Sequence, residues 1–262
     1  MRYILSFILI YSSVFALINK PIHSQITSIN QDEDRIYIKP VEGAQVGMFG
    51  VVVQSFDATH STALSWVEVL SIDTKSIIVR SIPIVALEQS ALPSGTWKPK
   101  IGDIVTLGYN YHRALLISPN ASAYKKVTNF HKQRHWVHPD IFATVLSSNG
   151  HPTPLVDDFK DTCRANNIGL LGFILERSIV TVDCQSFKII EVRTTTLSTK
   201  EVQLPFYTRV SNIEANWFGE GSDELLEFTP YYTKLLAENN PENDWIQTYQ
   251  NRENNNTSTQ GE

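Results

Sequence analysis

The sequence has few cysteines, no strong excess of charge and only one sustained apolar run. Among 262 residues there are 2 Cys, 12 Gly and 12 Pro, and charged residues make up 19%. This balance excludes a collagen, a coiled coil and a wholly disordered chain. The formal net charge of −5 argues against a nucleic-acid-binding protein, which needs a basic surface to neutralise phosphates. We therefore expect no nucleic acid among its partners.

The usual motifs of catalysis and of nucleotide or metal binding are also missing. The chain has no GxSxG, no Walker loop, no GxGxxG and no HExxH. His131 and His135 are four residues apart, a spacing at which two imidazoles on a helix can share a zinc ion. Lys132 and Arg134 add positive charge at that place. We expect surface histidines rather than a metal site, and no cofactor, small-molecule substrate or enzymatic activity.

Residues 1–16 have the pattern of a secretory signal peptide. Arg2 precedes a short apolar run from Tyr3 to Phe15, and Ala16 supplies a small residue before the expected cleavage site. The run is shorter than the roughly 20 apolar residues that a membrane-spanning helix needs. An uncleaved anchor is the alternative. We expect an exported protein without a transmembrane segment after cleavage, in the periplasm, in the outer membrane or on the cell surface.

Export changes the interpretation of the two cysteines, Cys163 and Cys184. In an oxidising compartment the two thiols can form a disulfide. That bond would close a loop of about 20 residues and contribute about 3 kcal/mol to stability. Two buried free thiols are the alternative. Neither residue belongs to a CxxC motif, so the sequence does not indicate a thiol–disulfide exchange enzyme.

The residue patterns predict an α+β protein in several parts. Short runs of β-branched residues between Gly and Pro turns favour a small β-barrel or sandwich over residues 17–118. Residues 119–212 predict helices packed on an antiparallel meander. Residues 213–250 form an acidic, aromatic segment with predicted helices. Residues 251–262 contain no apolar side chain to bury and are expected to be disordered.

End signals refine the prediction for the second part of the chain. Gly150 suits the C-terminal end of a helix, while Thr153 and Pro154 suit the N-cap and first position of the next. The predicted helices cover 122–133, 139–148, 153 to about 166–169, 224–228 and 231–238, and the predicted strands cover 170–175, 179–184 and 187–192.

The acidic segment also concentrates aromatic residues. From residue 213 onward only Lys234 and Arg252 are basic. The aromatic side chains either bury against the body of the protein or form a contact surface for a partner. They are Trp217, Phe218, Phe228, Tyr231, Tyr232 and Trp245.

Seven segments between about residues 20 and 240 carry a distinctive combination of residues. They are WKPKIGD (97–103), YHRALLISPN (111–120), HPDIFAT (138–144), NGHPTPL (149–155), TVDCQSF (181–187), LPFYTRV (204–210) and IEANWFGEG (213–221). Together they resemble the N-terminal domain of the plasminogen-binding proteins found in the envelope of epsilon-class proteobacteria. The resemblance implies an exported, adhesin-like, non-enzymatic protein of a Gram-negative bacterium that binds host plasminogen.

The resemblance also implies how plasminogen would be captured. Plasminogen docks through kringle modules, which hold a lysine ammonium between carboxylates and prefer a free C-terminal lysine. The sequence ends in Gly261 and Glu262, so we expect an internal lysine paired with a carboxylate to replace it. Ordinary surface ion pairs are the alternative interpretation of such pairs. The candidates are Lys234 with Glu238, which are four residues apart in a predicted helix, and Lys160 with Asp157 or Asp161.

The sequence leaves a second class of function open. In that alternative the protein is a structural or assembly module of the periplasm or outer membrane, and it contacts other envelope proteins without binding plasminogen.

Overall fold

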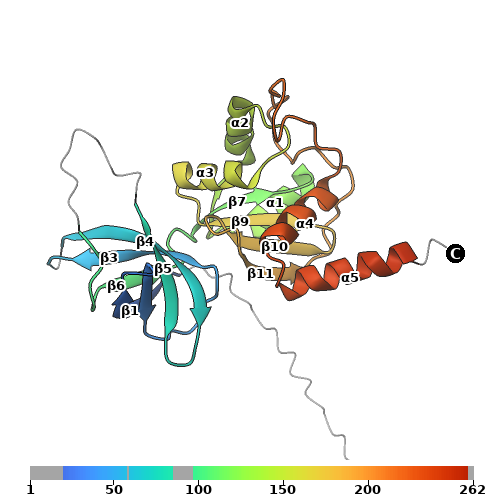
Figure 1. Ribbon diagram of the computed structural model, residues 1–262. Helices are drawn as coiled ribbons and strands as arrows, with labels where there is room; N and C mark the ends of the chain where they lie inside the picture. The colour runs from blue at the N-terminus through green and yellow to red at the C-terminus, as the bar shows by residue number, and fades with distance from the viewer. Residues whose placement is uncertain (1–19, 58, 85–96, 259–262) are drawn as a thin grey trace, which may run out of the picture.

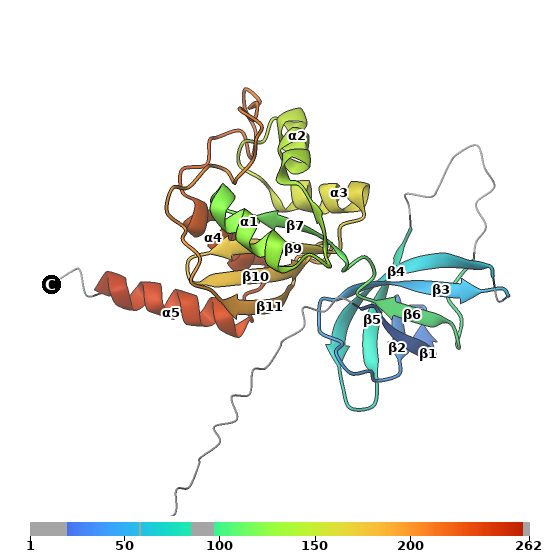
Figure 2. The ribbon, with the colours of Figure 1, turned by 180° about the vertical axis from the view of Figure 1, so that it is seen from behind.

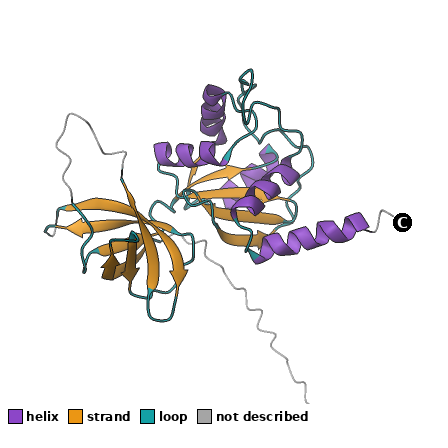
Figure 3. Ribbon diagram, in the orientation of Figure 1, coloured by secondary structure: helices purple, strands orange, loops and turns teal. Residues whose placement is uncertain are grey.

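The computed structural model describes residues 20–57, 59–84 and 97–258. The predicted signal peptide at 1–16 lies outside the described residues, as do residues 259–262 of the expected disordered tail. Figure 3 shows strands in both halves of the molecule and helices only in the second half. Within the described ranges, no helix has the length and apolar character that crossing a membrane requires.

Six antiparallel strands form the N-terminal barrel, which is closed and has the strand order β1-β2-β5-β4-β3-β6 (Figure 1). Pairing of β1 with β6, in which Ile22 lies opposite Leu107, completes the barrel. The predicted α+β class with an N-terminal barrel is confirmed, and the barrel rather than the sandwich is formed. The strands are β1 (Ile22–Asn30), β2 (Arg35–Ile38), β3 (Phe49–Ser55), β4 (Ser61–Ile72), β5 (Ile77–Pro83) and β6 (Ile104–Leu107).

Alternation along the strands fills the barrel interior. Ile36 and Ile38 of β2 are buried, as are Ile77 and Val79 of β5, while the residues between them are more exposed. Successive strand residues face opposite sides, so this period of two directs one apolar face inward. Burial of each such side chain contributes about 1.5–3 kcal/mol.

A five-stranded mixed sheet forms the centre of the second half, in the order β11-β10-β9-β7-β8. The predicted antiparallel meander is present as β9, β10 and β11. Two further strands extend it in parallel, because β7 pairs with both β8 and β9. The strands are β7 (Arg113–Ile117), β8 (His135–Val137), β9 (Leu170–Leu175), β10 (Ser178–Asp183) and β11 (Ile189–Thr194).

The position of β7 corrects the predicted domain boundary. The sequence places residues 113–117 in the barrel domain that ends at 118, whereas the structure places them in the second sheet. Ala114, Leu115, Leu116 and Ile117 are all buried. A run buried on both faces is typical of a parallel strand covered by helices, whereas barrel strands alternate.

Helices cover both faces of this sheet, as Figures 1 and 2 show for α4 and α1. Leu115 and Ile117 of β7 pack in one core with α2, α3 and α4, while Leu116 packs in another with α1. The two sets follow from the alternation of side chains along β7. The helices are α1 (Ala121–Phe130), α2 (Pro139–Asn149), α3 (Val156–Asn166), α4 (Phe228–Asn239) and α5 (Asp244–Ser258).

The start of α3 differs from the prediction. Leu155, not Thr153, occupies the N-cap position. The carboxylate of Asp158 accepts the Leu155 N–H at 2.8 Å and so satisfies an otherwise free donor at the helix start. Thr153 is engaged elsewhere, because its hydroxyl donates to the carbonyl of Asp223 at 2.6 Å.

The C-terminal helices also differ from the prediction. One helix, α4, replaces the two predicted around Pro230, because a proline is tolerated in the first turn of a helix. The chain from 251 to Ser258 is helical rather than disordered. The start of α5 is anchored, since Ile246 is buried and the Trp245 indole donates to Ser178 Oγ at 3.3 Å. An anchored first turn supplies the costly nucleus from which a polar helix extends.

Candidate functional site

Helix α4 presents Lys234 and Glu238 on its solvent side. The Lys234 Nζ lies 3.8 Å from the Glu238 Oε1, and their side chains are 75% and 58% exposed. The opposite side of α4 is fixed to the protein through the buried Tyr232, Leu235 and Leu236. The structure therefore brings this predicted pair together as an accessible ammonium and carboxylate on a rigid helix.

The second predicted pair is not formed. On α3, Asp161 pairs with Arg164 rather than with Lys160. Among the described residues, no ion pair joins Lys160 to Asp157 or Asp161. The backbone carbonyl of Lys160 instead accepts a hydrogen bond from the side chain of Gln185 at 3.3 Å.

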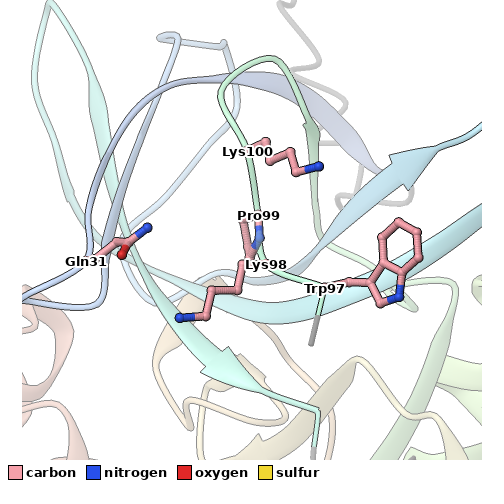
Figure 4. Close-up of a pocket in the computed structure, with 5 residues that line it drawn as sticks. All are labelled: Gln31, Trp97, Lys98, Pro99 and Lys100. Carbon is pink, nitrogen blue, oxygen red and sulfur yellow. The ribbon is translucent and has the colours of Figure 1, made fainter. Parts of the chain in front are cut away.

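A cleft at the end of the barrel contains two further exposed lysines. Its volume is about 450 Å³, and Figure 4 shows its lining residues, with Lys98 extending on the side of Gln31 and Lys100 on the side of Trp97. The Trp97 ring meets Phe56 edge-on, with 5.0 Å between ring centroids. This cleft was not predicted from the sequence, although the WKPK segment is one part of it. Gln31 and Phe56 join that segment only in the folded barrel.

The histidines do not share a helix face. Helix α1 ends at Phe130, His131 is its C-cap and His135 is the first residue of β8. The turn between them is closed by a hydrogen bond of 3.1 Å from the Arg134 N–H to the His131 carbonyl. The predicted helix over 122–133 is confirmed only as far as Phe130, so the helical spacing of the two imidazoles is wrong. In the described part of the chain, no three His, Cys, Asp or Glu side chains are grouped as metal ligands.

The two cysteines are joined in the structure. Cys163 on α3 and Cys184 after β10 form a disulfide, with 6.0 Å between their Cα atoms. Both are buried, at 1% and 0% exposure. The bond connects α3 to the sheet, which gives it a structural role.

The residue before this disulfide, Asp183, joins the two halves of the protein. Its carboxylate accepts hydrogen bonds from the Phe49 N–H of the barrel at 3.0 Å and from the Tyr111 hydroxyl at 2.8 Å. The N–H groups of Gln185 and Ser186 also donate to it, at 2.9 and 3.0 Å. Burial raises the pKa of Asp183, while these donors act in the opposite direction. All four of these donors are groups of this protein, so we assign the Asp183 carboxylate a structural role at the junction between the two halves.

The aromatic residues of the acidic segment divide into two groups. Phe228 and Tyr232 are buried in the core of the second half, and Tyr231 and Trp245 pack against it, so burial explains these four. Trp217 and Phe218 are 97% and 84% exposed. For these two residues the contact-surface interpretation fits and the burial interpretation does not.

Comparison with known proteins identifies the family. The family model described as the N-terminal domain of plasminogen-binding protein pgbA matches residues 21–236. This chain belongs to that family. The match covers the barrel, the sheet and most of α4, and it includes Lys234 but not Glu238.

Two curated relatives are similar to the chain. They are the plasminogen-binding proteins PgbA of Helicobacter pylori strains J99 and 26695, each 24% identical over 200 residues and 75% of this chain. The aligned region covers only 44% and 43% of those relatives, so the chain spans less than half their length. No solved structure shows significant similarity to the chain.

Proposed function

We propose that this protein is an exported plasminogen-binding protein that offers an internal lysine, Lys234, to a kringle module. The observation that carries the proposal is the exposed Lys234–Glu238 pair on α4 of a chain that belongs to the PgbA N-terminal family. The proposed activity is binding, not catalysis.

The pair carries the two charged groups of such a ligand, and they separate when the ion pair opens. A kringle site needs an ammonium that can enter between its carboxylates, and a second, negative group at a fixed distance from that ammonium. Lys234 supplies the first and Glu238 the second. Their separation of 3.8 Å is loose for an ion pair, and exposed pairs of this kind contribute only about 0.3–0.5 kcal/mol to a helix. The lysine can therefore leave its partner at little cost.

The first experiment measures binding of residues 17–262 to immobilised plasminogen, with and without a free lysine analogue. The expected result is binding that the analogue abolishes and that Lys234→Ala weakens at least about tenfold, a loss typical of a central contact residue. The matched control is Lys126→Ala, which removes an exposed lysine from helix α1.

Two further variants separate the candidate lysines. Glu238→Gln tests whether the carboxylate is part of the ligand, and should weaken binding without changing the helix content. The Lys98→Ala/Lys100→Ala double variant tests the barrel cleft. Binding that survives Lys234→Ala but is lost in the double variant would transfer the proposal to the cleft. Binding indifferent to the lysine analogue would refute kringle recognition altogether.

We further propose that the protein is exported to the periplasm, the outer membrane or the cell surface of a Gram-negative bacterium. The signal pattern at 1–16 supports this location, and a disulfide between Cys163 and Cys184 fits an oxidising compartment. Plasminogen capture requires the surface. Labelling of intact cells with a membrane-impermeant reagent should therefore label the protein.

A second candidate function is an envelope assembly module. It is favoured by the exposed Trp217 and Phe218, which lie within residues 210–227, a segment without lysine. A protein that resists surface labelling and does not bind plasminogen would support this alternative.

A further inference from the structure

The loop between β11 and α4 exposes apolar side chains to an unusual degree. Trp217 is 97% exposed, and Phe218 and Leu226 are each 84% exposed. The loop is seen beside α2 at the top of Figure 1. Large apolar side chains left in water forgo about 1.5–3 kcal/mol each of burial free energy. Two adjacent, almost fully exposed aromatic residues therefore indicate an interaction surface.

Backbone contacts hold this loop on both sides of its aromatic tip. The Asn216 N–H donates to the Gly150 carbonyl at 3.0 Å, and the Asn216 side chain donates to the Asn149 carbonyl at 2.7 Å. On the other side, the Thr153 N–H donates to the Gly221 carbonyl at 3.1 Å. The tip is thus attached to the end of α2 and to the segment that leads into α3. A loop held in this way loses less conformational entropy when it binds a partner.

The charged residues of the segment that carries the tip have one sign. Residues 210–227 include no Lys or Arg. Such a surface repels anionic lipid headgroups, and it attracts a partner with positive charge. The exposed acidic residues of this segment are Glu214, Glu220, Asp223, Glu224 and Glu227.

We propose that Trp217 and Phe218 form a docking surface for a basic, amphipathic segment of a partner protein. The aromatic side chains pack against the apolar face of that segment, and the carboxylates face its lysine or arginine side chains. Trp is over-represented among residues that dominate binding energy, and such residues act when surrounding contacts exclude water. Residues 210–227 contain no lysine, so this surface is separate from the proposed plasminogen ligand.

The experiment selects peptides without assuming their sequence. A phage-displayed library of random peptides of about 15 residues, long enough for one amphipathic helix or strand, is selected on residues 17–262 and counter-selected on Trp217→Ala/Phe218→Ala. The expected result is enrichment of sequences that combine Lys or Arg with large apolar residues. Failure to enrich any sequence, or enrichment of acidic or uncharged ones, would overturn the proposal.

Affinity measurements with the enriched peptide then test the two kinds of contact. Trp217→Ala/Phe218→Ala and Glu220→Gln/Asp223→Asn/Glu224→Gln should each bind at least about tenfold more weakly, and wild-type affinity should fall with salt. Phe130→Ala is the matched control, because Phe130 is 80% exposed on α1, and it should bind normally. Equal binding by the loop variants and the control would refute the proposal.

Two other binding partners of the loop, a second copy of this chain and a lipid surface, would give different results. Sedimentation of the wild type tests a second copy of this chain, which carries the basic cleft around Lys98 and Lys100. Self-association lost in Trp217→Ala/Phe218→Ala would assign the loop to that copy and overturn the proposal. Vesicles of anionic lipid should not bind the loop. Plasminogen binding should be unchanged in Trp217→Ala/Phe218→Ala, so failure of this proposal is separable from failure of the proposed function.

Discussion

The hydroxyl of Tyr111 donates a hydrogen bond of 2.8 Å to the carboxylate of Asp183, across the junction between the barrel and the second sheet. Tyr111 packs in the barrel core, and Asp183 ends β10. Both are 1% exposed. The junction therefore depends on a buried polar contact as well as on apolar packing.

Removing the Tyr111 hydroxyl should destabilise the protein. Tyr111→Phe keeps the ring but leaves the buried carboxylate without one of its donors, which costs about 1–3 kcal/mol. Urea unfolding measures the change. Tyr109→Phe is the control, because Tyr109 is 45% exposed and should lose less than about 0.5 kcal/mol. Equal effects of the two substitutions would contradict this role of the junction.

The disulfide should contribute to stability to a similar or greater extent. The Cys163→Ala/Cys184→Ala variant should lose about 3 kcal/mol, because the unfolded chain is no longer constrained. Thermal unfolding with and without reductant measures this difference. Denatured protein without reductant should show no reactive thiol, and reduction should reveal both. Two thiols before reduction would refute the bond.

The stability contribution of Asp140 should depend on pH. Burial acts to raise the pKa of Asp140, but hydrogen bonds from the Arg209 N–H, the Thr208 hydroxyl and the Arg209 guanidinium lower it to about 2. The stabilisation is therefore complete above about pH 4, the pKa in the unfolded chain. It is lost as the pH falls toward 2. Unfolding of Asp140→Asn should show a deficit of about 1 kcal/mol at pH 7 and almost none at pH 2.

If Asp140→Asn lowered the free energy of unfolding equally at pH 7 and pH 2, the carboxylate charge would not be the source of the stabilisation. Asp157→Asn provides the comparison, since Asp157 is another aspartate in the first turn of a helix.

The close pairing of β3 with β6 in the barrel requires a glycine at position 50. A Cβ at this position would lie 2.5 Å from the Thr106 carbonyl oxygen, in the pair of β3 with β6. Gly50→Ala should therefore cost about 1–3 kcal/mol through overpacking. Gly172→Ala is a milder comparison, because its Cβ would meet a leucine methyl at 3.0 Å. Circular dichroism and urea unfolding of both variants test the difference, and a smaller loss for Gly50→Ala would contradict the explanation.

Local patterns predicted the class of fold well. The alternation around Ile36 and Ile38, and the turn residues between strands, are readable from neighbouring residues alone. The parallel placement of β7 was not predicted, because its partner β9 begins more than fifty residues later in the chain. The Thr153 cap failed for a related reason, since its hydroxyl bonds to a distant loop carbonyl.

The candidate site shows the same division. Lys234 and Glu238 are four residues apart on one helix, so local spacing brings them together, whereas on α3 Asp161 pairs with Arg164 and not with Lys160. The cleft around Trp97 combines the WKPK segment with Gln31, which is brought there only by barrel closure. The exposure of Trp217 could not be predicted either, because the sequence alone does not show whether an aromatic side chain is buried or exposed.

The strand order also sets the sequence in which the chain can fold as it emerges from the ribosome or the export channel. All six barrel strands precede residue 108, so the barrel can close before the rest of the chain appears. β7 emerges next, but it cannot complete its pairing until β9 has followed. For that interval β7 lacks its β9 partner, and the apolar residues on that side are exposed to aggregation. The segment Ala114–Ile117 is therefore where a chaperone would most benefit the nascent protein.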